Sequence, residues 1–121
     1  MAKVTVLFRM VTAGDMSANI TSLGFNVQSM DNIGLEYVFT GTAATGTWVF
    51  VGSNDSVDGT SGSGTWFTVT PDGTLPTNPS GSSGANFGVA FTNYPYKWLQ
   101  VRYTRTSGSG TLNVIALGKE I

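Results

Sequence analysis

Hydrophobic positions along this chain alternate with polar ones in short runs, and no segment shows the 3.6-residue period of an amphipathic helix. The first run places apolar residues at every second position: Val4, Val6, Phe8 and Met10. Such alternation puts one set of side chains on the core face of a strand and the other set outward. Runs of this kind, separated by Gly-, Ser- and Thr-rich turns, predict eight strands at 3–11, 20–27, 34–40, 47–52, 65–70, 86–92, 98–104 and 111–117. The predicted fold class is all-β: an eight-stranded antiparallel β-sandwich, jelly-roll-like.

The outward positions of these strands are less polar than a monomer needs. Opposite the core set fall Leu7, Val38, Trp98, Ile115 and either Trp48 or Val49. Several apolar residues on a face that should meet water indicate cover by another subunit. We therefore expect a homo-oligomer, with Glu36 also on the shared surface; the alternative is a monomer with scattered exposed apolar groups.

The length of 121 residues suits one β-sandwich domain over 1–121. Within it, the segment 71–86 holds three of the four prolines and shows no strand pattern, which predicts a long Pro/Gly/Ser loop. Leu75 and its neighbouring proline leave two interpretations of this loop open. It is either a flexible excursion or an arm that docks on a neighbouring subunit or particle.

Composition removes several function classes. The chain has no Cys and no His, which excludes thiol catalysis, Cys-type zinc sites and every Ser-His nucleophile. A formal net charge of −1 argues against nucleic acid as the principal partner, and no apolar run reaches the length of about 18 residues that a membrane span needs. The N-terminal run is interrupted by Arg9, so we do not interpret it as a signal peptide. Most acidic residues lie in turn sequences, so we expect no enzyme and no cofactor.

The stretch "NDSVDG" at 54–59 resembles the start of a calcium-binding loop. Asn54, Ser56 and Asp58 alternate as oxygen ligands would, and Gly59 follows. The closing position, which needs a bidentate Glu, is Thr65. The stretch is therefore predicted to be a polar turn whose side chains bind their own backbone, with no metal.

The aromatic residues raise a second class of function. Trp48, Trp66, Trp98, Tyr94 and Tyr96 would form a platform for sugar rings if they were exposed. The segment 92–98, with Tyr94, Tyr96 and Trp98, is where a glycan would bind in this alternative.

Arg102 and Arg105 stand three residues apart in a predicted strand, so they point to opposite faces and form no common anion clamp. Arg102 shares a face with Trp98 and is expected to meet a carboxylate such as Glu36, from its own sheet or an adjoining subunit. Arg105 stands before "TSGSG", which is predicted to be a hairpin turn, and is expected to face solvent or a particle surface.

Three segments carry a resemblance to a known group of proteins: "GSND" at 52–55, "TWFTVT" at 65–70, and "YKWLQVRYTRTSGSGTLNVIALGKE" at 96–120. Their order resembles small β-sandwich structural proteins of tailed bacteriophages and prophages, and more distantly discoidin-like sandwiches. The loops before Trp66 and at 71–86 are longer than that pattern leads us to expect.

The resemblance implies a virion protein, made in the cytoplasm of the host bacterium. The specific expectation is a capsid decoration (cement) protein that binds the major capsid protein lattice of the assembled head. A tail or fibre component and a carbohydrate-binding module are the alternatives. A trimer is favoured over a dimer, because capsid lattices offer threefold sites.

Overall fold

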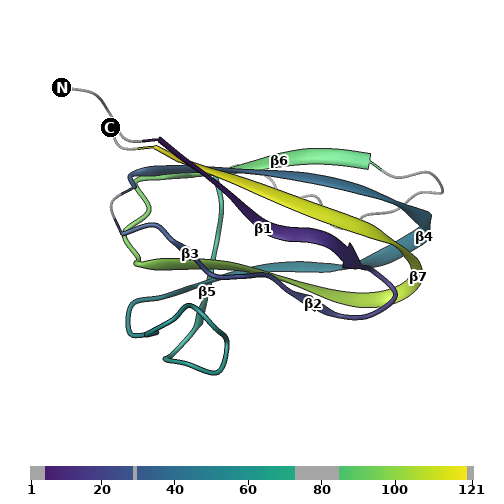
Figure 1. Ribbon diagram of the computed structural model, residues 1–121, viewed down its shortest axis with the longest axis horizontal. Helices are drawn as coiled ribbons and strands as arrows, with labels where there is room; N and C mark the ends of the chain where they lie inside the picture. The colour runs from purple at the N-terminus through teal and green to yellow at the C-terminus, as the bar shows by residue number, and fades with distance from the viewer. Residues whose placement is uncertain (1–4, 29, 73–84, 120–121) are drawn as a thin grey trace.

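The structure is a computed structural model, and it describes residues 5–28, 30–72 and 85–119. Its elements are all strands: β1 (Thr5–Asp15), β2 (Ile20–Thr21), β3 (Phe25–Asn26), β4 (Asn32–Ser53), β5 (Phe67–Val69), β6 (Ala85–Thr92) and β7 (Trp98–Lys119). The pairings between these strands are antiparallel. The predicted all-β fold is confirmed (Figure 1). Nowhere in the described ranges is there a helix that could span a membrane.

Two long strands organise the molecule. β4 and β7 pair from Asn32 and Lys119 at one end to Ser53 and Trp98 at the other. Irregular pairing near Thr45 marks the middle of this ribbon. The half built from 32–40 and 111–119 also pairs with β1 and β6, whereas the half built from 46–53 and 98–105 pairs with β2, β3 and β5.

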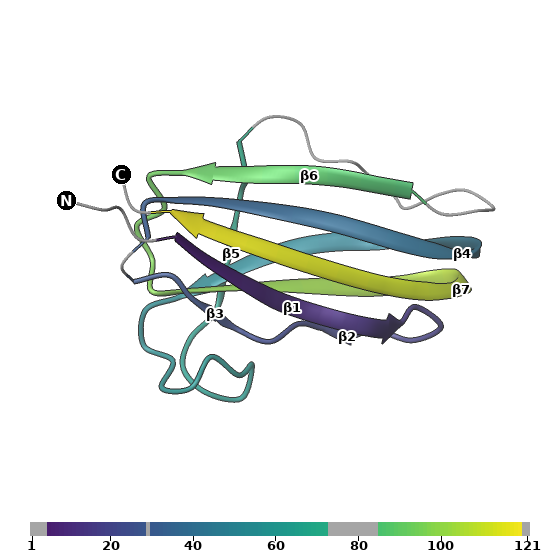
Figure 2. The same ribbon diagram turned by 45° about the horizontal axis from the view of Figure 1, so that its top comes forward.

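The sheet therefore curls into two layers, as Figures 1 and 2 show. The first layer has the order β1, β7, β4, β6, and the second has β2 and β3, then β7, β4 and β5. The eight predicted strands all correspond to parts of these elements. Two of them are the two halves of β4, two are the two halves of β7, and the predicted strand 20–27 contains both β2 and β3.

The hairpin turn predicted at "TSGSG" is wrong. Residues 106–110 continue β7 and pair with β4, including Ser107 with Thr45 and Ser109 with Thr42. The two halves of β7 thus lie in different layers and do not pair with each other. Gly108 has a φ of 81°, which a residue without a β-carbon adopts freely, and this local freedom helps the ribbon bend while its pairing continues.

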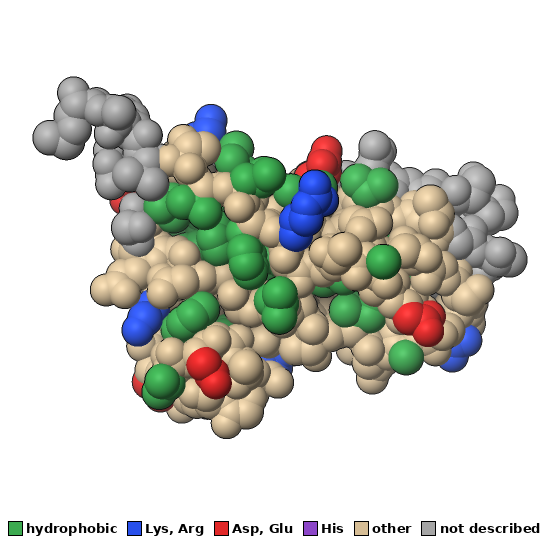
Figure 3. All heavy atoms as spheres, in the orientation of Figure 1, with side chains coloured by type: hydrophobic (Ala, Val, Ile, Leu, Met, Phe, Trp, Pro, Cys, Tyr) green, Lys and Arg blue, Asp and Glu red, His purple; other side chains and the backbone are tan. Residues whose placement is uncertain are grey.

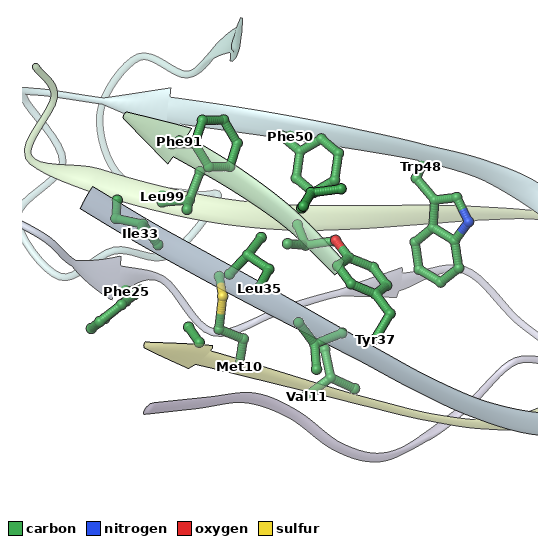
Figure 4. Close-up of a cluster of buried hydrophobic side chains, with 14 of the residues drawn as sticks. Met10, Val11, Phe25, Ile33, Leu35, Tyr37, Trp48, Phe50, Phe91 and Leu99 are labelled. Carbon is green, nitrogen blue, oxygen red and sulfur yellow. The ribbon is translucent and has the colours of Figure 1, made fainter. Parts of the chain in front are cut away.

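The core fills the space between the layers. Leu35 and Tyr37 of the first layer face Phe50 and Leu99 of the second, and all four are at most 3% exposed. Figure 4 shows Tyr37 beside Trp48; their ring centroids are 4.8 Å apart in an edge-to-face contact. Burial raises the pKa of the Tyr37 hydroxyl well above its usual value. Trp48 is in the core, so Val49 is the outward residue of the pair that the sequence left open.

The predicted loop 71–86 is described only at its ends. Asp72 forms an isolated bridge with Ala90, and Ala85 already begins β6. The remainder, including Leu75, lies outside the described residues.

Candidate functional site

The outer surface of the first layer carries apolar side chains that nothing in the described chain covers. We call this surface the open face; its outward residues are Leu7, Arg9, Glu36, Val38, Ile115 and Leu117. Leu7 is 63% exposed, and Val38, Ile115 and Leu117 are half-buried. Figure 3 shows hydrophobic side chains gathered over β1 and β7, next to a basic and an acidic group. The outward positions predicted for Leu7, Val38 and Ile115 are confirmed.

The outer surface of the second layer, which we call the covered face, is closed by a loop of the same chain. Residues 54–66 lie over it, in the teal segment that projects below β3 and β5 in Figures 1 and 2. Trp98 is 9% exposed and donates its indole N–H to the carbonyl of Ser56 at 3.0 Å. Gln100 is 1% exposed, within hydrogen-bond range of the carbonyl of Gly59.

The expectation that Trp98 lies on an outward surface left for another subunit is therefore wrong. Trp98 does point away from the core, as the alternation predicts, but its own chain covers it. Its burial depends on Gly59, which has a φ of 77° and lies against the Trp98 ring. A β-carbon at Gly59 would come within 2.5 Å of that ring.

The 54–66 loop is held by its own polar groups. Asp55 accepts hydrogen bonds from the backbone N–H of Thr65 at 2.7 Å and from the Ser53 hydroxyl at 3.0 Å, and these bonds lower the pKa of its carboxyl. Asp58 accepts bonds from the N–H and the hydroxyl of Thr60, which likewise lower its pKa. These are the self-bonded turns that the sequence predicts for 54–59.

The tip of this loop presents an apolar side chain to solvent. Val57 is 85% exposed, although its backbone N–H is fixed by the Ser63 hydroxyl at 2.9 Å. At the end of the loop, the Trp66 indole N–H bonds to the carbonyls of Thr60 and Ser63. The loop is thus an internally braced projection with a hydrophobic tip, which the sequence pattern did not reveal because Val57 belongs to no strand.

The aromatic cluster expected at 92–98 is mostly internal. Tyr94 is 7% exposed and donates its hydroxyl to the carbonyl of Trp98 at 2.8 Å. Burial raises the pKa of this hydroxyl. Of the three residues suggested for a glycan, only Tyr96 reaches the surface, where it meets the 37% exposed Phe67 edge to face at 4.8 Å. Two rings at this angle form no flat platform.

A shallow hollow of about 250 Å³ lies beside Tyr96. Its polar lining includes Asp72, which accepts a hydrogen bond from the Thr92 hydroxyl.

The two arginines have separate environments, as predicted. Arg102 donates its Nε–H to the side-chain oxygen of Gln100 at 2.9 Å and lies 6.0 Å from the centroid of the Trp66 ring. Arg105 is exposed and donates its Nε–H to the carbonyl of Gly108 at 2.9 Å. The expected ion pair between Arg102 and Glu36 within one chain is wrong, because Glu36 is on the open face and Arg102 on the covered face.

Comparison with known proteins identifies the fold class. No protein-family model matches the chain, and no curated protein matches its sequence. Among solved structures, the chain is similar to the SPBc2 prophage-derived protein YomS, with a TM-score of 0.57 and 10% identity over 97% of this chain and 96% of that one.

Two longer proteins contain a similar domain. The PBSX exported protein XepA gives a TM-score of 0.62 and 19% identity over 99% of this chain and 39% of that one. VP2 of the infectious bursal disease virus subviral particle gives a TM-score of 0.50 and 13% identity over 98% of this chain and 32% of that one. At these identities the shared property is the β-sandwich, whose described residues here include the open face, the covered face and the projecting 54–66 loop.

Proposed function

We propose that this chain is a structural component of a bacteriophage or prophage particle, and that it decorates the assembled head by binding the major capsid protein lattice. The observation that carries the proposal is the reciprocal match to a prophage-derived protein, which spans nearly the full length of both chains. The similarity to a domain of VP2 from a subviral particle supports it, since a sandwich of this class also occurs in a virus shell protein.

The arrangement of surfaces supports a binding role. Polar side chains of the 54–66 loop, such as Asp55 and Asp58, are engaged in bonds within that loop, so their task is to fix its shape. A braced loop loses little conformational entropy when it docks, which favours binding through a small contact area. A decoration protein needs such a preformed projection because it binds a finished lattice.

The 54–66 loop is the part that we propose to contact the capsid. Its tip, Val57, is apolar and 85% exposed, and the packing of the core does not depend on it. On a capsid, Val57 would insert into an apolar recess between shell subunits. The open face lies on the other layer and remains free in this arrangement.

Immunogold electron microscopy of particles from the producing bacterium tests the proposal. An antibody against the purified chain is expected to label the heads of intact particles, and the purified chain is expected to bind assembled heads but not the isolated shell subunit. Label on tails or fibres would instead support the tail or fibre alternative. Particles that carry no label and contain no copy of the chain by mass spectrometry would refute a virion role.

A variant tests the proposed contact. Val57→Asp is expected to weaken binding to assembled heads by roughly tenfold or more, since a buried charge without a partner is unfavourable in an apolar recess. Ser61→Asp is the matched control, because Ser61 is also exposed in the same loop. Equal binding by both variants, with unchanged melting temperatures, would show that the tip is not the contact.

A further inference from the structure

The open face is complementary to itself in both charge and shape. Its strands are in register, so its outward residues form rows across β1, β7 and β4. One row contains Arg9, Ile115 and Glu36, and the next contains Leu7, Leu117 and Gly34. We propose that a second copy of this chain covers the open face, related by a two-fold axis that runs parallel to β7 above Ile115. This inference is independent of the virion role.

The charged row determines the position of the axis. Arg9 and Glu36 are exposed and flank Ile115 from the two neighbouring strands. Within the described chain, neither side chain forms an ion pair or hydrogen bond. Strands are about 4.8 Å apart, so the α-carbons of Arg9 and Glu36 stand roughly 5 Å to either side of β7. An axis along β7 exchanges these sides and brings each arginine opposite the glutamate of the other copy.

The apolar row fits the same axis. Leu7 projects from β1, and the equivalent place on β4 is Gly34. A β-carbon added at Gly34 would have no heavy atom within 4 Å beyond its chain neighbours. A hollow of about 380 Å³ lies there, lined in part by Ala90 and Leu117. The two-fold operation places Leu7 of one copy above this hollow of the other, so that a protruding side chain fills a gap.

Other placements of the axis are less favourable. An axis shifted by half a strand spacing, between β7 and β4, would set Ile115 of one copy against Glu36 of the other. Each carboxylate would then lose water without gaining a cation, at a cost that an interface of this size does not offset. The favoured axis keeps the strands of the two copies nearly aligned, as in common sheet-on-sheet packing.

The dimensions of the face set the strength of the dimer. Three strands of about nine residues measure roughly 15 by 30 Å, which buries about 450 Å² on each copy before side-chain relief is counted. The total for the two copies, about 900 Å², is at the lower limit of specific interfaces, so the dimer should form at micromolar concentrations and dissociate on dilution. A two-fold dimer also differs from the trimer that the resemblance to phage proteins favoured.

Sedimentation of the purified chain from about 1 to about 500 µM tests the inference. The mass is expected to rise from 12.7 kDa to twice that value over this range. Arg9→Glu and Glu36→Arg should each weaken association by roughly tenfold or more, because like charges then meet at two places. The double variant should restore association to within about threefold of the original chain.

Two further variants separate shape from charge. Gly34→Val puts side-chain atoms into the hollow from a β-carbon that itself meets no heavy atom within 4 Å. It is expected to weaken association by roughly tenfold while the dilute chain stays folded, as a thermal melt would show. Thr104→Glu, an exposed change on the second layer, is the charge control and should leave association unchanged. A monomeric or trimeric mass at the highest concentration would overturn the proposal. So would failure of the double charge exchange to restore association, or normal association of Gly34→Val.

Discussion

The two outer faces of this sandwich begin from similar sequence patterns and end in opposite states. Both carry large apolar residues at outward positions, Trp98 and Val51 on one side and Leu7 and Ile115 on the other. The 54–66 loop buries Trp98, which is 9% exposed, and Val51 on the same face is 4% exposed, whereas Leu7 stays 63% exposed. An apolar outward position therefore indicates that something covers it, but the cover can come from the same chain.

The largest contrast between the faces is expected from truncating one apolar residue on each. Trp98→Ala should lower the free energy of unfolding by about 3 to 5 kcal/mol, because it removes a buried ring and the anchor of the 54–66 loop. Leu7→Ala should change it by about 0.5 kcal/mol or less in the dilute monomer. Urea denaturation of both variants measures the difference; similar losses would show that the faces are not as different as their burial indicates.

Gly59 makes the covered face possible, so a methyl group there should loosen it. Gly59→Ala is expected to lower the free energy of unfolding by about 1 to 3 kcal/mol, since it forces a β-carbon toward the Trp98 ring at positive φ. Gly62→Ala in the same loop is the control, because a β-carbon there meets no heavy atom within 4 Å. Thermal melts should separate the two, and an unaffected Gly59→Ala would contradict the close packing of loop and ring.

The arginine pair gives a smaller contrast. Arg102→Ala should lower the free energy of unfolding by about 1 to 2 kcal/mol. The reason is that the side-chain oxygen of Gln100, a residue that is 1% exposed, loses its hydrogen-bond donor. Arg105→Ala should change the free energy of unfolding by about 0.5 kcal/mol or less, because Arg105 is exposed and its side chain donates to the nearby carbonyl of Gly108. Chemical denaturation of both variants is the measurement, and equal losses would argue against different roles.

The smallest expected effect is a pH dependence of the loop. Hydrogen bonds from Thr65 and Ser53 lower the folded-state pKa of Asp55 below its unfolded value of about 3.9. The stabilisation is therefore present above that pH and is lost as the pH falls through the folded-state pKa. Asp55→Asn should lower the melting temperature at neutral pH. The difference in melting temperature between this variant and the original chain should shrink in acid.

Asp58→Asn provides the comparison for this experiment. Asp58 bonds only to Thr60, two residues away, whereas Asp55 joins Ser53 and Thr65 at the two ends of the loop. The pH-dependent difference should therefore be smaller for Asp58→Asn. A larger effect from Asp58 would mean that the loop ends are held by other contacts.

Local patterns were reliable for single strands. Alternation placed Met10 inside and Leu7 and Ile115 outside, because a strand turns successive side chains to opposite faces regardless of its partners. The self-bonded turn at 54–59 was also predictable, since Asp and Ser reach backbone groups only a few residues away. Arg9 and Leu117 of the open face follow from the same alternation.

Pairing across long distances was not predictable. "TSGSG" has the composition of a hairpin turn, yet β4 pairs with it and carries β7 from one layer to the other. The position of Gly34 opposite Leu7 likewise depends on the register of three strands that are far apart in the sequence.

The sequence alone determined that the chain folds as an antiparallel β-sandwich. It also determined that several outward positions of the strands are apolar. Both properties depend on residues that are close together in the sequence. The tertiary structure decided which of those residues are covered. Trp98 is buried because a loop more than thirty residues earlier in the chain folds over it, and Glu36 is separated from Arg102 because the long ribbon places them on opposite layers. Both outcomes come from contacts between distant segments, whose formation depends on the packing of the whole chain.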